Sequence, residues 1–164
     1  MKKNTGMTGN HSHNMLKDEW LTPPEIIKSL GLFHLDPCSP INRPWNTAVN
    51  HLTINDDGLN SNWNGRVWCN PPYGRETFKW LDKLSEHGNG IALIFARTET
   101  KGFFSSVWKK ADAVFFFEGR LTFHHVTGER AAANGGAPSC LVIYGKNNIE
   151  SVEKSGLKGK LILL

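Results

Sequence analysis

Continuous apolar runs alternate along the chain with segments in which apolar residues recur at helical spacing. The run at 90–96, Gly-Ile-Ala-Leu-Ile-Phe-Ala, is typical of a strand buried on both faces of a sheet. In the segment 75–87, Phe78, Leu81 and Leu84 recur three residues apart, which predicts an amphipathic helix. This alternation indicates an α/β fold with a mainly parallel sheet, an antiparallel edge and helices on both faces. The expected strands are 32–35, 66–69, 90–96 and 113–117, and the expected helices are 23–30, 75–87 and 103–111.

Capping residues set the expected ends of the first helix. Thr22 is a predicted N-cap because Glu25 follows it three residues later. Pro23 suits the first helical turn, and Gly31 predicts the end of the helix. The helix is therefore expected to be short and to begin just after a Thr-Pro dipeptide.

Other segments are expected to be less regular. The stretch 40–64 is rich in Asn and Pro, and only 48–54 within it has a regular pattern. The segments 121–124 and 139–144 are expected to pair as antiparallel strands near one edge of the sheet. The end of the tail 147–164, Lys-Leu-Ile-Leu-Leu, predicts an added edge strand.

Length and composition indicate a single soluble domain. A chain of 164 residues can bury one core but is too short for separate catalytic and recognition domains. Residues 1–17 are polar and rich in turn formers, so we expect a disordered N-terminal tail followed by one domain at 18–164. No apolar run approaches the ~20 residues of a membrane span, and no apolar segment follows the first charged residues. We therefore expect a cytoplasmic protein without membrane contact.

The cysteines and the net charge exclude some classes of site. The three cysteines, Cys38, Cys69 and Cys140, form no Cys-x-x-Cys pair, so the sequence predicts neither a metal site nor a disulfide framework. We interpret Cys38 and Cys69 as packing residues, because no neighbouring His or cation lowers the pKa of either thiol. A net charge of +4 is a mild excess that favours a polyanionic partner only slightly.

The tetrad Asn70-Pro71-Pro72-Tyr73 has the most specific chemistry in the sequence. It follows the predicted strand 66–69, and open parallel sheets bind ligands at the carboxyl ends of their strands. An amino group conjugated to a ring is a poor nucleophile because its lone pair is delocalised. The side-chain oxygen of Asn70 and the carbonyl of Pro71 can accept its two hydrogens. The nitrogen is then drawn towards tetrahedral geometry, which frees its lone pair for attack.

Tyr73 has two possible roles. Its ring offers a flat face for an extruded base, and such stacking contributes ~1 to 3 kcal/mol against a flipping cost of a few kcal/mol. Alternatively, the two prolines only end the strand, and the Tyr73 ring packs on the core. The residues alone leave both interpretations open.

Five further segments accompany the tetrad, and together they resemble the DNA N6-adenine methyltransferases of phages and prophages. The resemblance extends from Asp18 to Gly145. It implies a trimmed Rossmann-like methyltransferase sheet, S-adenosyl-L-methionine as cofactor, double-stranded DNA as partner, and flipping of the target adenine into the tetrad. The five segments are Glu-Trp-Leu-Thr-Pro-Pro-Glu at 19–25, Leu-Asp-Pro-Cys-Ser at 35–39, Asp-Gly-Leu at 57–59 with Trp63, Gly-Arg-Leu-Thr-Phe at 119–123, and Pro-Ser-Cys-Leu-Val-Ile-Tyr-Gly at 138–145.

The resemblance also implies roles for individual residues. The tetrad is catalytic, one group of residues lines the methionine end of the cofactor, and a Thr-Pro pair closes over that end. An acidic residue meets the adenosine part. By position, Asp36, Pro37 and Cys38 form the lining group, Thr22 and Pro23 the closing pair, and Asp57 the acidic residue, with Asp56 as a rival.

Two departures from the family pattern concern the cofactor side. The segment 36–41, Asp-Pro-Cys-Ser-Pro-Ile, contains no glycine, so the usual Gly-x-Gly turn is absent and the cofactor loop must run differently. Only 34 positions separate Asp36 from Asn70, whereas one parallel crossover takes about a dozen residues. We therefore expect a trimmed sheet with Asp56 and Asp57 on a loop or on one short strand.

An enzyme that flips a base must also hold the phosphate backbone. Lys and Arg around the site mouth are the expected contacts, and an aromatic residue is the expected second wall of the base pocket. The segment 124–138 lacks periodicity and is expected to be a mobile loop that contacts DNA. The candidates are Arg75, Lys79, Arg97, Lys101, Arg120 and Arg130, with Phe123 as the second wall.

Several alternatives stay open. Enzymes that methylate adenine in RNA or glutamine in proteins have similar tetrads. The missing glycine turn also allows a non-catalytic nucleic-acid-binding module that has lost its cofactor. The target sequence, a role in restriction-modification, and the choice between a monomer and a weak homodimer are not determined by the residues.

Overall fold

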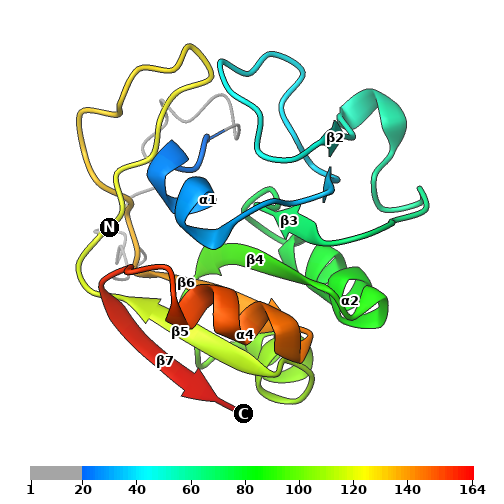
Figure 1. Ribbon diagram of the computed structural model, residues 1–164, viewed down its shortest axis with the longest axis vertical. Helices are drawn as coiled ribbons and strands as arrows, with labels where there is room; N and C mark the ends of the chain where they lie inside the picture. Colours follow the sequence, from blue (N-terminus) through cyan, green and yellow to red (C-terminus); the bar gives the residue numbers. More distant parts are fainter. Residues whose placement is uncertain (1–19) are drawn as a thin grey trace, which may run out of the picture.

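A computed structural model describes residues 20–164, so the expected tail at 1–17 lies outside the described residues. A central sheet carries α1 and α4 on one face and α2 and α3 on the other (Figure 1). None of the helices in this described part has the length and apolarity needed to cross a bilayer. The strands are β1 (Leu35–Asp36), β2 (Asn50–His51), β3 (Val67–Cys69), β4 (Gly90–Phe95), β5 (Ala113–Phe117), β6 (Ser139–Tyr144) and β7 (Gly159–Leu163). The helices are α1 (Pro24–Leu30), α2 (Thr77–His87), α3 (Lys101–Phe103) and α4 (Lys146–Glu153), with a 3₁₀ turn η1 (Ile54–Asp56) and a π-helical turn η2 (Phe104–Trp108).

The sheet has seven strands in the order β2-β1-β3-β4-β6-β5-β7. The pairs of β1 with β2, β1 with β3 and β3 with β4 are parallel, whereas β6 runs antiparallel to both β4 and β5, and β7 antiparallel to β5. Five strands therefore point in one direction, and β6 and β7 oppose them. The α/β fold with a mainly parallel strand direction is confirmed, and β7 is the expected edge strand.

Alternating strand residues build one core on each face of the sheet. Trp68 and Ile91, which are register partners, pack on the face covered by α1 and α4. Their neighbours Cys69 and Ala92 pack on the opposite face, with the buried residues of α2 and η2. The strands β3 and β4 are buried on both faces, which explains why their sequences are continuously apolar.

Two strand predictions are corrected by the structure. The segment 121–124 is not a strand, because both edges of β5 are already occupied by β6 and β7. Its backbone pairs instead with loops: His124 forms isolated bridges with Leu21 and Arg130. The segment 139–144 is a strand, but it lies inside the sheet between β4 and β5 rather than near an edge.

The helices also differ in detail from the predictions. Pro23 rather than Thr22 is the N-cap of α1, and no side chain caps this helix. Gly31 ends it at a φ of 86°, as predicted. The helix expected at 103–111 begins earlier, because the Thr100 side chain accepts from the Phe103 N–H and starts α3 two residues upstream. The helix α4 was not predicted, because its pattern is weak.

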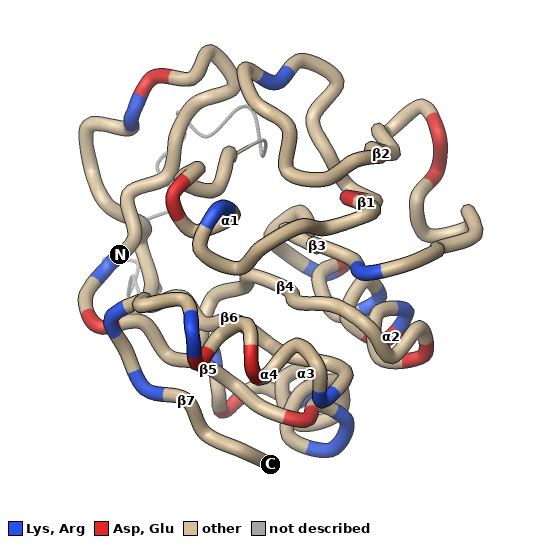
Figure 2. The backbone as a smooth tube through the Cα atoms, viewed as in Figure 1, with Lys and Arg blue, Asp and Glu red and all other residues tan. Residues whose placement is uncertain are grey.

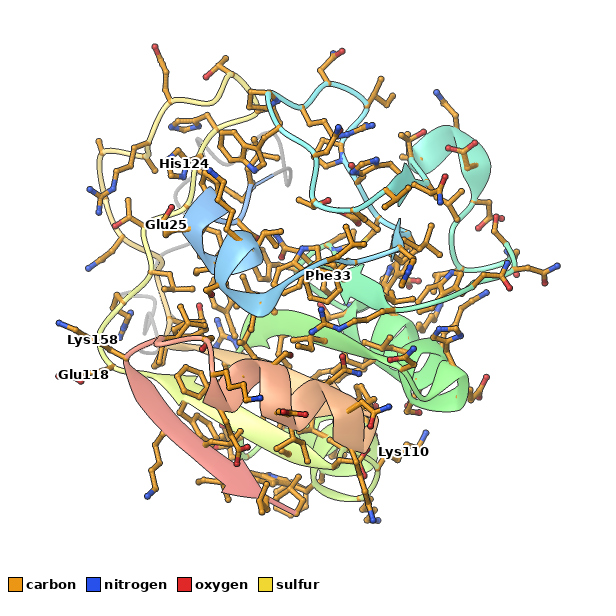
Figure 3. All side chains as sticks on the ribbon, viewed as in Figure 1. Glu25, Phe33, Lys110, Glu118, His124 and Lys158 are labelled. Atoms are coloured by element: carbon orange, nitrogen blue, oxygen red, sulfur yellow. The ribbon has the colours of Figure 1, made fainter. Side chains whose placement is uncertain are left out.

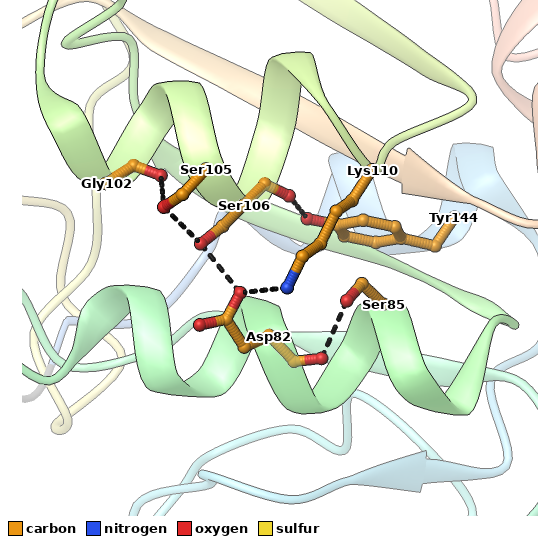
Figure 4. A network of polar contacts seen from close by, with 7 residues as sticks. All are labelled: Asp82, Ser85, Gly102, Ser105, Ser106, Lys110 and Tyr144. Carbon is orange, nitrogen blue, oxygen red and sulfur yellow. Dashed lines mark hydrogen bonds and ion pairs between the residues drawn. The ribbon is translucent and has the colours of Figure 1, made fainter.

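A polar network ties α2 to η2. The Asp82 carboxylate of α2 accepts hydrogen bonds from the Ser106 hydroxyl and from Lys110 Nζ, each at 2.8 Å (Figure 4). The Tyr144 hydroxyl of β6 donates to the main-chain carbonyl of Ser106. The helix that follows the tetrad is thus held against the segment that follows β4.

Candidate active site

A cavity of about 810 Å³ opens where β1 and β3 end. Because parallel strands end at the same edge, segments distant in sequence meet there. Its walls come from the residues before α1, the 36–40 loop, the segment around η1, the tetrad and α2. The lining residues are Trp20, Leu21, Thr22, Asp36, Pro37, Cys38, Ser39, Pro40, Thr47, Thr53, Ile54, Asp57, Gly58, Trp68, Asn70, Pro72 and Trp80.

Asp36 is a buried carboxyl in the wall of this cavity, and only 4% of its surface is exposed. It accepts hydrogen bonds from the Thr47 hydroxyl and, at 3.2 Å, from the Cys38 main-chain N–H. Burial nevertheless raises the pKa of Asp36 to about 6, although both hydrogen bonds and the charge of Arg43 act in the opposite direction. A positively charged ligand group beside Asp36 would stabilise its ionised form and lower this pKa.

The two cysteines of the site face each other. The sulfur atoms of Cys38 and Cys69 lie 3.8 Å apart. Their mutual hydrogen bond and then burial raise the pKa of Cys38 well above its ordinary value. A thiol with a raised pKa is a poor nucleophile at neutral pH, so Cys38 is suited to packing rather than to nucleophilic attack.

The Asn70 amide is held by the segment that precedes α1. Its Nδ2 donates to the Trp20 carbonyl at 3.1 Å and to the Thr22 hydroxyl at 3.3 Å. A carbonyl oxygen can only accept, so the amide nitrogen must face Trp20. The Asn70 Oδ1 oxygen therefore points away from these partners, and the residue itself lines the cavity. Sequence reasoning did not identify the Trp20 carbonyl, because a main-chain group leaves no signal in the sequence.

The rest of the tetrad is placed in different environments. The Tyr73 ring stacks on Phe95 with centroids 4.3 Å apart, and Phe123 meets it edge-on at 6.4 Å. The Tyr73 hydroxyl is buried with no hydrogen-bond partner in residues 20–164, and burial raises the pKa of this hydroxyl. Pro71 is buried, whereas Pro72 lines the cavity. One face of the Tyr73 ring therefore packs on the core, and stacking of a base on its other face stays a prediction.

Of the adjacent acidic residues Asp56, which ends η1, and Asp57, which follows it, the structure brings Asp57 to the cavity. Asp56 instead closes a capping box, because its Oδ2 accepts from the Thr53 N–H at 2.7 Å and from the Thr53 hydroxyl at 2.9 Å. Asp57 follows η1 with a φ of 49°, so the expected loop position is confirmed. Pro23 does not line the cavity, since it caps α1.

Gly58 is a cavity residue that sequence reasoning missed. A Cβ added at Gly58 would collide with the Pro37 carbonyl oxygen and lie 2.9 Å from the Trp80 ring. The η1 loop can therefore approach the 36–40 loop closely only because residue 58 is glycine. In the usual family pattern a Gly-x-Gly turn lets the backbone approach closely; here the glycine stands on the η1 loop, which faces the 36–40 loop. The Asp-Gly dipeptide at 57–58 is the only sign of this arrangement in the sequence.

The expected DNA contacts divide into exposed cations and one core residue. All six Lys and Arg candidates are exposed, and they lie in segments that follow β3, β4 or β5. Lys79 pairs with Glu76 at 3.0 Å, and Figure 2 shows Lys and Arg at separate points of the tube rather than in one cluster. Phe123 is only 5% exposed and packs edge-on against Tyr73, and its role as the second wall of a base pocket stays a prediction.

The segment 121–131 crosses the start of α1, where Figure 3 shows His124 and Glu25. The Leu21 N–H donates to the His124 carbonyl at 2.8 Å, and the His124 N–H donates back at 3.0 Å. The Trp20 and His125 rings lie 4.8 Å apart. This crossing places the 124–138 loop beside the residues that hold Asn70; its mobility and its contact with DNA stay predictions.

The comparisons with known proteins give the family of the chain. A family model described as DNA N-6-adenine-methyltransferase (Dam) matches residues 9–158. No curated protein and no solved structure matches the chain. Because the family match covers most of the chain and includes every residue of the cavity, the chain belongs to the DNA N-6-adenine-methyltransferase (Dam) family.

Proposed function

We propose that the chain uses S-adenosyl-L-methionine to methylate the N6 amino group of a specific adenine in double-stranded DNA, after flipping that base towards the tetrad. The observation that carries this proposal is the orientation of the Asn70 amide. Its nitrogen is occupied by two acceptors, which leaves its oxygen for an amino group in a cavity of about 810 Å³. We also propose that the chain acts in the cytoplasm.

The cavity residues fit the proposed cofactor. The buried Asp36 carboxyl suits the cationic methionine end, because a nearby positive charge stabilises its ionised form. Asp57 keeps one carboxylate oxygen free for a sugar hydroxyl, since its Oδ2 accepts from Asn60 at 2.7 Å. Trp80 supplies an apolar surface for the purine. The indole Nε1 of Trp68 is buried without a partner in the described residues and offers a ligand one more donor.

The chain's own groups would activate and hold the target base. When bound, S-adenosyl-L-methionine supplies an electrophilic methyl group on a positively charged sulfur. The Asn70 Oδ1 and the Pro71 carbonyl accept the two hydrogens of the adenine amino group, which concentrates its lone pair on nitrogen. No hydrogen bond within residues 20–164 uses either oxygen, so both are free for this task. The amino proton leaves to water after the transfer, and no protein base is required.

The Tyr73 ring serves as the floor for the flipped base. One of its faces is covered by Phe95, so a base can stack only on the opposite face. The exposed cations that follow β3, β4 and β5 then contact the phosphates around the site mouth. Base contacts from the 124–138 loop would determine the target sequence.

Incubation with labelled S-adenosyl-L-methionine and unmethylated duplex DNA tests the proposal, with nucleoside analysis of the product. We expect labelled N6-methyladenine in the DNA. The Asn70→Ala variant should lose this activity while still binding S-adenosylhomocysteine in calorimetry. The matched control Asn64→Ala, which removes an exposed amide, should keep it.

Parallel incubations distinguish the alternatives. Stronger labelling of tRNA, rRNA or a protein fraction than of DNA would overturn the DNA assignment. Absence of saturable S-adenosylhomocysteine binding would favour a non-catalytic nucleic-acid-binding module.

A further inference from the structure

We infer that Thr22 is a positioning residue for methyl transfer, which acts by holding the Asn70 amide in the orientation that directs Oδ1 at the target amino group. The inference deepens the proposed function and rests on it. It differs from the role that the family resemblance implies for Thr22, which is to close over the cofactor.

The hydrogen bonds of Asn70 divide its amide into an occupied end and a free end. The Nδ2 group has two hydrogens, and it has two acceptors: the Trp20 carbonyl at 3.1 Å and the Thr22 hydroxyl at 3.3 Å. With both hydrogens used, a rotated amide would place Oδ1 against the lone pairs of the Trp20 carbonyl. The Trp20 carbonyl can only accept, so it selects this orientation of the amide. The Thr22 hydroxyl accepts the second hydrogen and holds the amide there, and these two acceptors form the clamp.

The backbone that carries the two clamp residues, Trp20 and Thr22, is held by hydrogen bonds. Leu21 exchanges two main-chain hydrogen bonds with His124, at 2.8 and 3.0 Å, so the residues on either side of Leu21 are fixed. Leu21 is 4% exposed and Thr22 is 2% exposed. A β-branched side chain has few χ1 rotamers, which restricts where the Thr22 hydroxyl can lie.

The position of Thr22 also explains why its hydroxyl does not cap α1. The cap position belongs to Pro23, and no side chain caps the helix. The Thr22 hydroxyl instead reaches a residue 48 positions later in the chain. The Thr22 hydroxyl therefore contacts the Asn70 amide rather than the first turn of α1, as expected of a residue that positions this amide.

Kinetics separate positioning from cofactor closure. Thr22→Val removes the hydroxyl at nearly constant volume, and we expect kcat to fall about tenfold, the loss of about one hydrogen bond, while the Kd of S-adenosylhomocysteine changes less than threefold. Thr22→Ser keeps the hydroxyl and should restore most of kcat. Thr98→Val, which removes a hydroxyl outside the site, is the matched control. Thr22→Ala replaces the valine variant if the latter does not fold.

The outcomes are distinct. Unchanged kcat in both Thr22→Val and Thr22→Ala overturns the inference, and so does an equal loss in Thr22→Ser. A raised Kd with kcat retained at saturation assigns Thr22 to cofactor closure instead. A wild-type protein that methylates no adenine contradicts the proposed function and leaves the spectroscopic test to decide the clamp.

The spectroscopic test needs no activity. The side-chain amide signals of Asn70 in a ¹H–¹⁵N spectrum are identified by their disappearance in Asn70→Ala. Thr22→Val should shift these signals and broaden them as the amide begins to rotate, whereas Thr22→Ser and Thr98→Val should leave them in place. Signals that are identical in Thr22→Val and wild type would show that there is no clamp.

Discussion

Protonation of Asp36 is expected to weaken cofactor binding below neutral pH. Burial raises the pKa of this carboxyl from 3.8 to about 6. A ligand with a cationic methionine end binds the ionised form, so its affinity follows the fraction of Asp36 that is ionised. At about pH 7.5 nearly all of the carboxyl is ionised, whereas at about pH 5 only about one tenth is. The apparent Kd should therefore rise about tenfold between these two pH values.

The raised pKa of Asp36 also affects the stability of the ligand-free protein, which should decrease as the pH rises. Because the pKa of Asp36 is higher in the folded than in the unfolded state, the folded state holds the proton more tightly. The stabilising contribution is present below about pH 4 and is lost as the pH rises through about 6. The loss is of the order of 3 kcal/mol. Asp36→Asn should therefore raise the melting temperature at neutral pH while it weakens cofactor binding.

Calorimetric titration with S-adenosylhomocysteine across this pH range is the assay. Asp36→Asn should bind weakly and with a flat pH profile, and the exposed-carboxylate control Glu118→Gln should keep the wild-type profile. His51, the register partner of Asp36, has a pKa lowered to about 4 by burial and then by Arg43, so it stays neutral throughout. A flat wild-type profile, or an equal slope in Asp36→Asn, would refute the reasoning.

Three further predictions follow from the packing. Gly58→Ala should displace the Pro37 carbonyl, weaken S-adenosylhomocysteine binding at least tenfold in calorimetry and lower the melting temperature, because backbone atoms must move to admit the new methyl group; unchanged affinity would contradict the close approach. Tyr73→Phe should keep its activity and match or exceed the wild-type melting temperature, because the lost hydroxyl is buried without a partner; a clear fall in melting temperature would reveal a missed hydrogen bond. Arg66→Ala should lower the free energy of unfolding by about 3 kcal/mol in urea, since its guanidinium donates four hydrogen bonds and lies 4.1 Å from the Phe33 ring centroid; a change below about 1 kcal/mol would speak against this role.

Local patterns were sufficient for much of the fold. The continuous run at 90–96 and the apolar spacing in 75–87 predicted β4 and α2, because burial on two faces or on one stripe imposes these periods on the chain itself. The tetrad was recognisable for a similar reason, since two prolines directly after a buried strand place Asn70 at the strand's carboxyl end. These features depend on residues that are neighbours in sequence.

The pairing of the strands could not be predicted from local patterns, because it depends on which strand edges are free. The segment 121–124 has a strand-like pattern, yet β5 has no free edge to receive it. The pattern of β6 showed a buried strand but not its place between β4 and β5. Pairing partners are chosen among all strands at once, and the hydrophobic period of one strand carries no record of that choice.

By itself, the sequence determined the α/β class, the position of the tetrad after a buried strand and the family resemblance. Only the tertiary structure decided that Asp57 rather than Asp56 reaches the cavity, that Tyr73 stacks on Phe95, and that Trp20 and Thr22 hold the Asn70 amide. The physical reason is distance along the chain. Periodicity and capping report interactions within a few residues, whereas the site is assembled from segments about 50 positions apart, brought together by the strands that end at one edge of the sheet.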